Sequence, residues 1–233
     1  MTLTLEPDPG NAGVGINGIF PSYVLRLHYP QPQDIYFEGG IFMNQSIKRI
    51  TESAILIAIG TVLSLFTFMG FWQLGGGITF CSMLPPVMIA QRYGTRWGTL
   101  SAVLYGVLQC LLGLSNVNYA PDALTAIGII LLDYVFAFGA LGFSACFNKM
   151  LSNRRLSIVL GIVFTMTVRF LCHFASGILI WEALWPNSAG WAPAIWSLAY
   201  NGSYMLPEIL ITSVVALVSF VPLKQYWLGV EGA

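Results

Sequence analysis

The fold class of this chain is decided by residues 156–181, LSIVLGIVFTMTVRFLCHFASGILIW. The stretch is almost wholly apolar, and Arg169 is its one charged residue. A helix needs about 20 mostly apolar residues to cross the hydrocarbon core of a bilayer. We therefore predict a membrane-spanning helix over 156–181.

The rest of the chain has the same character. Of its 233 residues, 56% are hydrophobic and 9% are charged, whereas a soluble domain is about 25% charged because its surface faces water. We expect an all-α integral membrane protein of the cell membrane, in contact with lipid. Its six predicted transmembrane helices are 50–69, 77–91, 98–113, 123–147, 156–181 and 195–222.

The positions of the basic residues predict the orientation. Basic residues near the ends of spans mark the cytoplasmic side. Eight of the ten lie before the first predicted span, in alternate loops or after the sixth: Lys48, Arg49, Arg92, Arg96, Lys149, Arg154, Arg155 and Lys224. The other loops have Asp122 and Glu182 instead. Both termini are therefore expected in the cytoplasm.

Several functions lack their sequence signals. The chain has no phosphate-binding G-x-x-x-x-G-K-[ST] and no H-E-x-x-H, so neither ATP hydrolysis by that route nor a zinc protease site is predicted. Its four cysteines are widely spaced and form no C-x-x-C. Cysteines of this kind are expected to act as small hydrophobic side chains. Its net charge of zero does not indicate a nucleic-acid partner. We expect no catalytic residues, no metal and no cofactor.

Ionisable residues inside the predicted spans are the candidate functional residues, because burying them in a membrane is costly. They are Asp133, Arg169, His173 and Glu208, with Asn201 as a polar neighbour. At 1.5 Å per residue, three helices place Asp133, His173 and Asn201 at similar depth, near the outer face. One alternative is structural: an Asp133–Arg169 ion pair between helices, supported by His173. Glu208 is given no role.

A second pattern favours a pocket. Arg169, His173, Gly177 and Trp181 recur every four residues, which forms a stripe on one helix face. A pocket with a carboxylate, an imidazole, an amide and indole faces suits a small, flat, cationic heterocycle. The carboxylate supplies the counter-charge, and the indole adds cation–π contact.

Four segments resemble the thiamin-specific substrate-binding subunit of energy-coupling-factor (ECF) transporters. They are QRYGTRWGTLSAVLYGVLQCLLG (91–113), LLDYVFAFGALG (131–142), RFLCHFASGILIW (169–181) and WSLAYNGSYMLPE (196–208). The resemblance covers about residues 43–224. It implies a six-helix subunit that captures thiamin at the extracellular side with high affinity. It also implies three partners, a transmembrane coupling subunit and two cytoplasmic ATPases.

The resemblance also implies a set of binding residues. Arg169 lies in a stretch that the family shares, and we expect it to support Asp133. Tryptophan replaces the usual tyrosine at 196, which removes a hydroxyl. The residues expected to bind the substrate are Asp133, Tyr134, His173, Trp181, Trp196 and Asn201, with Trp72 in the first outer loop.

A partner surface is expected on the first predicted span. Ala54 and Ala58 form a small-x-x-x-small pair, which lets another helix approach closely. Such pairs are also common by chance in apolar helices. The resemblance implies that this pair docks the coupling subunit.

Residues 1–42 differ from the membrane domain, 43–233. Their proline and glycine content predicts a disordered segment. Residues 4–15 can be encoded by a string that resembles part of the thiamin-pyrophosphate riboswitch, and FEGG (37–40) by a ribosome-binding site. We expect Met43 to be the true start, although a cytoplasmic tail is an alternative.

Two other functions stay open at this point. The same scaffold can serve a different vitamin, or the chain can be a stand-alone secondary transporter driven by an ion. A binding titration against a vitamin panel separates the first from thiamin capture, and uptake without ATPase partners favours the second.

Overall fold

A computed structural model describes residues 2–7, 23–28, 45–69 and 77–229. Met43 and Trp72 lie outside the described residues. The chain divides into two units, 1–44 and 45–233. In the first unit β1 (Thr2–Pro7) pairs antiparallel with β2 (Tyr23–His28), where the sequence predicts disorder.

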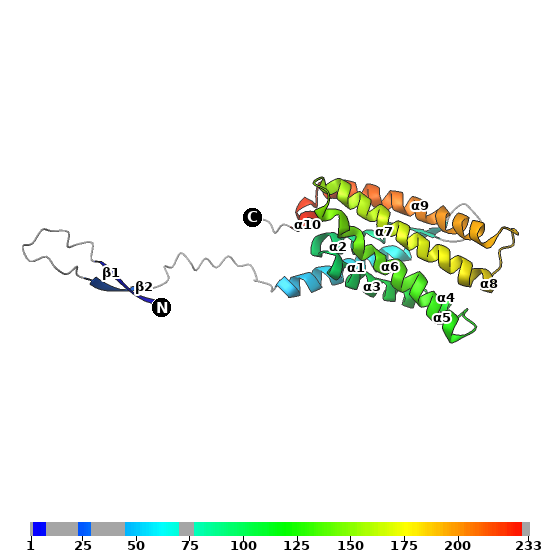
Figure 1. Ribbon diagram of the computed structural model, residues 1–233, viewed down its shortest axis with the longest axis horizontal. Coiled ribbons are helices and arrows are strands. Elements are labelled where there is room, and N and C mark those ends of the chain that lie inside the picture. Colours follow the sequence, from blue (N-terminus) through cyan, green and yellow to red (C-terminus); the bar gives the residue numbers. More distant parts are fainter. Residues whose placement is uncertain (1, 8–22, 29–44, 70–76, 230–233) are drawn as a thin grey trace, which may run out of the picture. The chain divides into compact units, whose positions relative to one another are not determined.

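The second unit is predominantly helical (Figure 1). Its first elements are α1 (Gln45–Leu65), the strand pair β3 (Thr67–Met69) and β4 (Gly77–Thr79), α2 (Leu84–Tyr93), α3 (Thr95–Leu112) and α4 (Leu114–Val117). A long helix follows, built from α5 (Ala123–Ile129), the π-helical η2 (Ile130–Phe136), α6 (Ala137–Gly139) and the 3₁₀-helical η3 (Ala140–Lys149). The last elements are α7 (Arg154–Ser176), the π-helical η4 (Gly177–Trp181), α8 (Glu182–Leu184), α9 (Pro193–Phe220) and α10 (Lys224–Leu228).

Three helical stretches among the described residues are long and apolar enough to cross a membrane: Ala123–Lys149, Arg154–Leu184 and Pro193–Phe220. They contain the predicted spans 123–147 and 156–181 and most of 195–222. The predicted helix 77–91 is wrong in its first half, because β4 and a turn precede α2. The ten residues of α2 extend only about 15 Å. The predicted span 50–69 also ends too late, since the helix stops at Leu65 and β3 follows.

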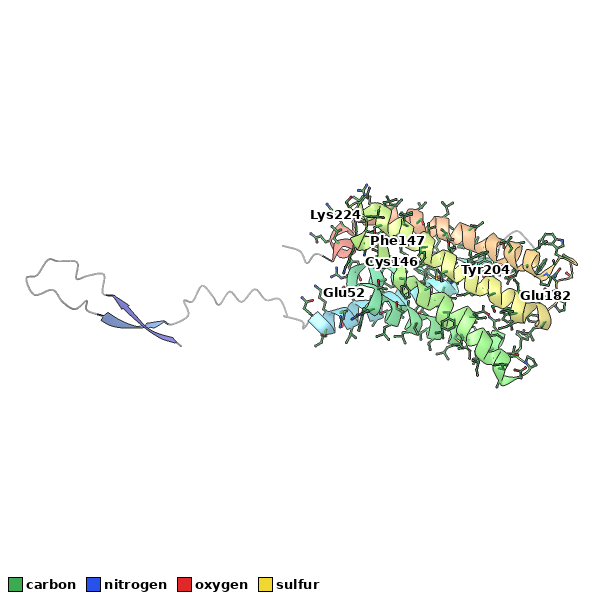
Figure 2. The ribbon with its side chains drawn as sticks, in the orientation of Figure 1. Glu52, Cys146, Phe147, Glu182, Tyr204 and Lys224 are labelled. Atoms are coloured by element: carbon green, nitrogen blue, oxygen red, sulfur yellow. The ribbon has the colours of Figure 1, made fainter. Side chains whose placement is uncertain are left out.

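The helical unit has two distinct ends (Figure 1). One end carries α4, α5 and α8, and is called the α8 end; the opposite end carries α10 and the start of α1, and is called the α10 end. Figure 2 places Glu182 at the first and Glu52 and Lys224 at the second. Between the ends, α7 packs against both η3 and α9. Gly161 allows this close approach, because a Cβ there would overlap the carbonyl oxygen of Ser144.

Two arginine side chains make the main polar contacts at the α10 end. The Arg92 guanidinium forms an ion pair with Glu52 of α1 at 2.8 Å, and it lies 4.3 Å from the ring centroid of Tyr226 in α10. Arg154 of α7 donates to the carbonyl oxygen of Trp227 at 3.1 Å. The Trp227 side chain, which the sequence places beyond the sixth span, is fully buried. These contacts hold α10 against α2 and α7.

Asp122 begins the long helix at the α8 end. Its carboxylate accepts from the Thr125 backbone N–H at 2.9 Å and from the Thr125 hydroxyl at 3.1 Å, as an N-cap residue does. These hydrogen bonds, the backbone one first, hold the pKa of the Asp122 carboxyl below its usual value. The cap fixes where the helix that contains Asp133 starts.

Candidate functional site

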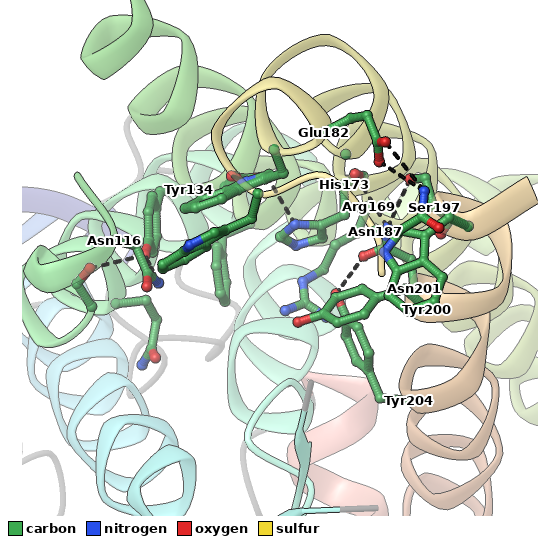
Figure 3. A pocket seen from close by; sticks show the side chains of 18 of the residues that line it. Asn116, Tyr134, Arg169, His173, Glu182, Asn187, Ser197, Tyr200, Asn201 and Tyr204 are labelled. Carbon is green, nitrogen blue, oxygen red and sulfur yellow. Dashed lines mark hydrogen bonds and ion pairs between the residues drawn. The ribbon is translucent and has the colours of Figure 1, made fainter. Parts of the chain in front are cut away.

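A cavity of about 860 Å³ lies toward the α8 end of the helical unit, within the range of about 300–1,000 Å³ that is typical of small-molecule sites. Figure 3 shows Tyr134 and Asn116 on one side of it, Asn201 and Tyr204 on the other, and His173 between them. The structure brings together all the predicted binding residues that it describes. Those lining the cavity are Asp133, Tyr134, His173, Trp181, Trp196 and Asn201.

The Asp133 carboxylate is the centre of the site. One oxygen is 3.1 Å from His173 Nδ1, and the other accepts from the Ser176 hydroxyl and from the Trp181 indole N–H, each at 2.9 Å. Because an ionised carboxylate only accepts hydrogen bonds, the Ser176 hydroxyl and the Trp181 indole fit it without cancelling its charge, and so does His173 as a neutral imidazole. Asp133 is 7% exposed and lies in η2, and π-helical turns of this kind are frequent at functional sites.

One ring nitrogen of His173 is hydrogen-bonded and the other has no partner. Its Nδ1 faces the Asp133 carboxylate, so Nδ1 is the nitrogen that donates, and in a neutral ring Nε2 is then an acceptor. Nε2 is buried and has no hydrogen-bond partner among the described residues. A buried acceptor without a partner costs free energy, and a ligand N–H in the cavity can remove this cost.

Trp181 belongs to a row of aromatic rings at the mouth of the cavity. Its ring stacks on that of Trp185, with centroids 6.1 Å apart and an interplanar angle of 16°. Trp185 in turn contacts Tyr119, with centroids 4.3 Å apart. Trp181 lies in η4, and the hydrogen bond to Asp133 orients its indole. The row provides flat apolar faces next to a negative charge.

The α9 side of the cavity is fixed by hydrogen bonds within the helix. Asn201 donates through Nδ2 to the Ser197 carbonyl oxygen at 3.0 Å and accepts through Oδ1 from the Tyr204 hydroxyl at 2.8 Å. Gly177 allows α9 to come close, because a Cβ there would overlap the Ser197 side chain. The Asn201 amide therefore has a set orientation beside His173, whose carbonyl oxygen it also contacts at 3.3 Å.

The opposite wall is held through Tyr134. Its hydroxyl donates to the Gly113 carbonyl oxygen at 3.3 Å and accepts from Asn116 Nδ2 at 3.1 Å. These bonds connect η2 to the end of α3 and to α4. Tyr134 is 7% exposed, and its ring packs parallel to Phe138 at 6.4 Å.

The expected support of Asp133 by Arg169 is wrong. Arg169 Nη1 lies 3.2 Å from Glu208 Oε2 in a buried ion pair, and its guanidinium carbon is 4.8 Å from the Phe138 ring centroid. The alternative Asp133–Arg169 ion pair does not occur among the described residues, because Glu208 takes the guanidinium. Glu208, to which the sequence assigned no role, thus has a defined partner.

Among the residues that the sequence did not predict, Ser176, Tyr204 and Asn116 are hydrogen-bonded to predicted site residues. A signal existed for two of them. Ser176 follows His173 by three residues and Tyr204 follows Asn201 by three, and residues three apart share a helix face. Asn116 gives no such signal, because it lies in a short helix between longer ones.

The expected docking pair lies on the surface of α1. Ala54 and Ala58 are exposed, while Ser53, Ile57 and Gly60 of the same helix are buried. Exposed apolar side chains flank the alanines, including Ile55 at 54% and Ile59 at 46%. This face of α1 is therefore free to contact lipid or another helix.

Comparisons with known proteins agree with one another. The model of the thiamine transporter protein family matches residues 50–227. The chain is 29% identical over 189 residues to the thiamine transporter ThiT of Bacillus subtilis (strain 168), covering 76% of this chain and 94% of that protein. The solved structure of ThiT from Listeria monocytogenes has the same fold, with a TM-score of 0.64 and 23% identity, covering 79% of this chain and 99% of that one.

Proposed function

The chain belongs to the thiamine transporter protein family, and from this premise we propose that it is the thiamin-binding subunit of an ATP-driven ECF transporter. It is a multi-pass protein of the cell membrane and a transport protein rather than an enzyme. The proposal adds the mode of capture, the residues that bind, the orientation and the partners.

One observation supports the choice of ligand above the others, namely the Asp133 carboxylate with its neutral donors. His173, Ser176 and Trp181 fix its position and leave its full negative charge beside the cavity. Thiamin has a permanently charged thiazolium ring, so Asp133 is the counter-charge for that ring. The Trp181–Trp185 stack offers ring faces for cation–π contact, which contributes about 2 kcal/mol when desolvated.

The aminopyrimidine ring of thiamin has its own partners in the proposal. His173 Nε2 accepts a hydrogen bond from the amino group, which fits a buried nitrogen without a partner. Asn201, held by Tyr204, faces the ring nitrogens. Trp196 adds an aromatic face and Tyr134 lines the opposite wall. Trp72 stays a prediction, because it lies outside the described residues.

The orientation follows from the charges at the two ends. The basic residues Arg92 and Arg154 lie at the α10 end with Glu52 and Trp227, and basic residues mark the cytoplasmic side. The α8 end, with Asp122 and Glu182, then faces outward and opens the cavity to the exterior. The proposal retains six membrane helices with both termini in the cytoplasm, and α2 is the short one that lies within the bundle.

The proposed partners are the transmembrane coupling subunit and two cytoplasmic ATPases. The exposed Ala54–Ala58 face of α1 is the proposed contact for the coupling subunit, since small residues let helices approach closely. ATP hydrolysis in the partner subunits supplies the energy, and this chain supplies the binding site.

Two measurements test the proposal. Isothermal titration of the purified protein with thiamin, riboflavin, biotin and folate should give binding for thiamin and at least about 100-fold weaker affinity for the others. In vesicles, thiamin uptake should require the coupling subunit, both ATPases and ATP. Preference for another vitamin contradicts the ligand, and uptake by this chain alone contradicts the ECF mechanism.

A further inference from the structure

We propose that Glu208 is a positioning residue that keeps Arg169 away from Asp133, so that the charge of Asp133 stays available to a cationic ligand. The inference rests on the proposed function and concerns the same cavity. Two cations can pair with Asp133, the guanidinium of Arg169 and the charged ring of the ligand. Glu208 holds the guanidinium and so leaves Asp133 to the ligand.

Glu208 is itself firmly held. It is 1% exposed, and one of its oxygens lies 3.2 Å from Arg169 Nη1. The other oxygen accepts from the backbone N–H of Thr79 in β4 at 3.4 Å and from the Thr79 hydroxyl. That hydroxyl also lies 2.6 Å from the Ser82 hydroxyl. Both oxygens of Glu208 therefore have partners, from α7 and from β4.

Arg169 is the competing cation. It lines the same cavity as Asp133 and is 7% exposed, and its Nε has no hydrogen-bond partner among the described residues. It precedes His173 by four residues, about 6 Å along the helix, and His173 contacts Asp133. Without Glu208, the carboxylates that line this cavity and remain for the guanidinium are Asp133 and Glu182.

The charges of the two pairs explain the arrangement. Arg169 and Glu208 together are neutral, so they add little net field to the cavity. Asp133 is bonded to neutral donors and remains negative. If Glu208 loses its charge, Arg169 stays buried without compensation, and it either pairs with Asp133 or repels a cationic ligand. Each outcome weakens the binding of a cation far more than the binding of a neutral ligand of the same shape.

The test compares thiamin with deazathiamin, an uncharged analogue in which carbon replaces the thiazolium nitrogen. For Glu208→Gln, isothermal titration should show the affinity for thiamin lowered by about 100-fold and the affinity for deazathiamin lowered by less than about fivefold. A purely structural role weakens both ligands alike, and equal weakening therefore overturns the proposal.

Two further variants keep the test decisive if Glu208→Gln folds poorly. Arg169→Met leaves the negative charge of Glu208 without its partner beside the cavity, so the ratio of thiamin to deazathiamin affinity should rise rather than fall. The double variant Glu208→Gln/Arg169→Met removes both charges and should restore thiamin affinity to within about tenfold of the parent. A ratio unmoved by Arg169→Met, or a double variant that binds thiamin no better than Glu208→Gln, contradicts the inference.

The matched control is Glu52→Gln, which breaks the ion pair with Arg92 at the α10 end. It removes the same charge from an Arg–Glu pair that is more exposed and does not line the cavity, and the affinity ratio should not change. If the parent protein does not bind thiamin, the proposed function fails. If the parent binds thiamin but the ratio is unchanged in Glu208→Gln, the proposed function stands and the role of Glu208 fails.

Discussion

The two ends of the helical unit compensate their carboxylates differently. At the α10 end, the Glu52 carboxylate is compensated by Arg92 at 2.8 Å, and the guanidinium also contacts the Tyr226 ring. Toward the α8 end, the Asp133 carboxylate is bonded to neutral donors and lies beside a cavity of about 860 Å³. The first arrangement stabilises the fold, and we propose that the second keeps the Asp133 charge available to the ligand.

The difference has a physical cost. A buried charge without a counter-charge is expensive, and the fold offsets part of that cost at Asp133 with three hydrogen bonds. Such arrangements are common at functional sites. Substitutions at the α10 end should therefore change mainly the stability of the fold. Substitutions around Asp133 should change mainly the affinity for thiamin.

The largest effect is expected for Trp181→Ala. The substitution removes a ring face and one donor to Asp133, at a cost of about 2–4 kcal/mol, which weakens thiamin binding by about 30- to 1,000-fold. Trp181→Phe keeps a ring, so its affinity for thiamin should lie between those of Trp181→Ala and the parent. Titration calorimetry measures the affinity of all three proteins. Parent-like affinity in Trp181→Ala would mean that the aromatic row is not part of the binding site.

The next effect concerns transport rather than binding. Ala54→Leu/Ala58→Leu places bulky side chains on the exposed face of α1, so uptake in vesicles with the partner subunits should fall by at least about tenfold. Thiamin affinity of the purified subunit should not change, because the face lies away from the cavity. Val62→Leu, a nearby exposed position on α1, is the control. Normal uptake by the double variant would show that the alanines only contact lipid.

A smaller effect is expected for Ser176→Ala. Ser176 is fully buried and donates to Asp133 at 2.9 Å, and one lost hydrogen bond of about 1 kcal/mol corresponds to about fivefold in affinity. Fluorescence titration with thiamin is sensitive enough to resolve this change. Weakening as large as that of Trp181→Ala would mean that Ser176 supports the helix rather than the carboxylate.

The smallest effect on affinity is expected for Trp227→Ala, although it should lower stability most. Trp227 is fully buried at the α10 end, and replacing such a residue costs about 3 kcal/mol or more. Thermal unfolding should begin at a lower temperature, while the thiamin affinity of the folded protein stays within about twofold of the parent. A large loss of affinity would mean that the two ends are coupled.

Much of the fold could be predicted from apolar length alone. The stretches around 123–147, 156–181 and 195–222 became the three longest helices because each is long and nearly free of charge. The region 77–91 could not be assigned in this way. It is mostly apolar, and hydropathy does not distinguish β4, a turn and a short buried helix from one span.

Some members of the site could be predicted from the sequence, but their hydrogen bonds and ion pairs could not. Asp133, His173 and Asn201 follow from polar residues at similar depth, and Trp181 follows from the stripe of residues spaced by four. The pairing of Arg169 with Glu208 did not follow, because it depends on the rotation of α9 and on Thr79 in β4. The π-helical turns at Asp133 and Trp181 also have no sequence signal, and they set the directions of both side chains.

The central claim is that the charge of Asp133 is kept for thiamin, and Asp133→Asn tests it most directly. The substitution keeps the shape, removes the charge and places an amide among three donors. Isothermal titration of thiamin should show one site in the parent and affinity at least about 100-fold weaker in Asp133→Asn, with Glu52→Gln unchanged. Parent-like affinity in Asp133→Asn would contradict the account and place the binding site elsewhere.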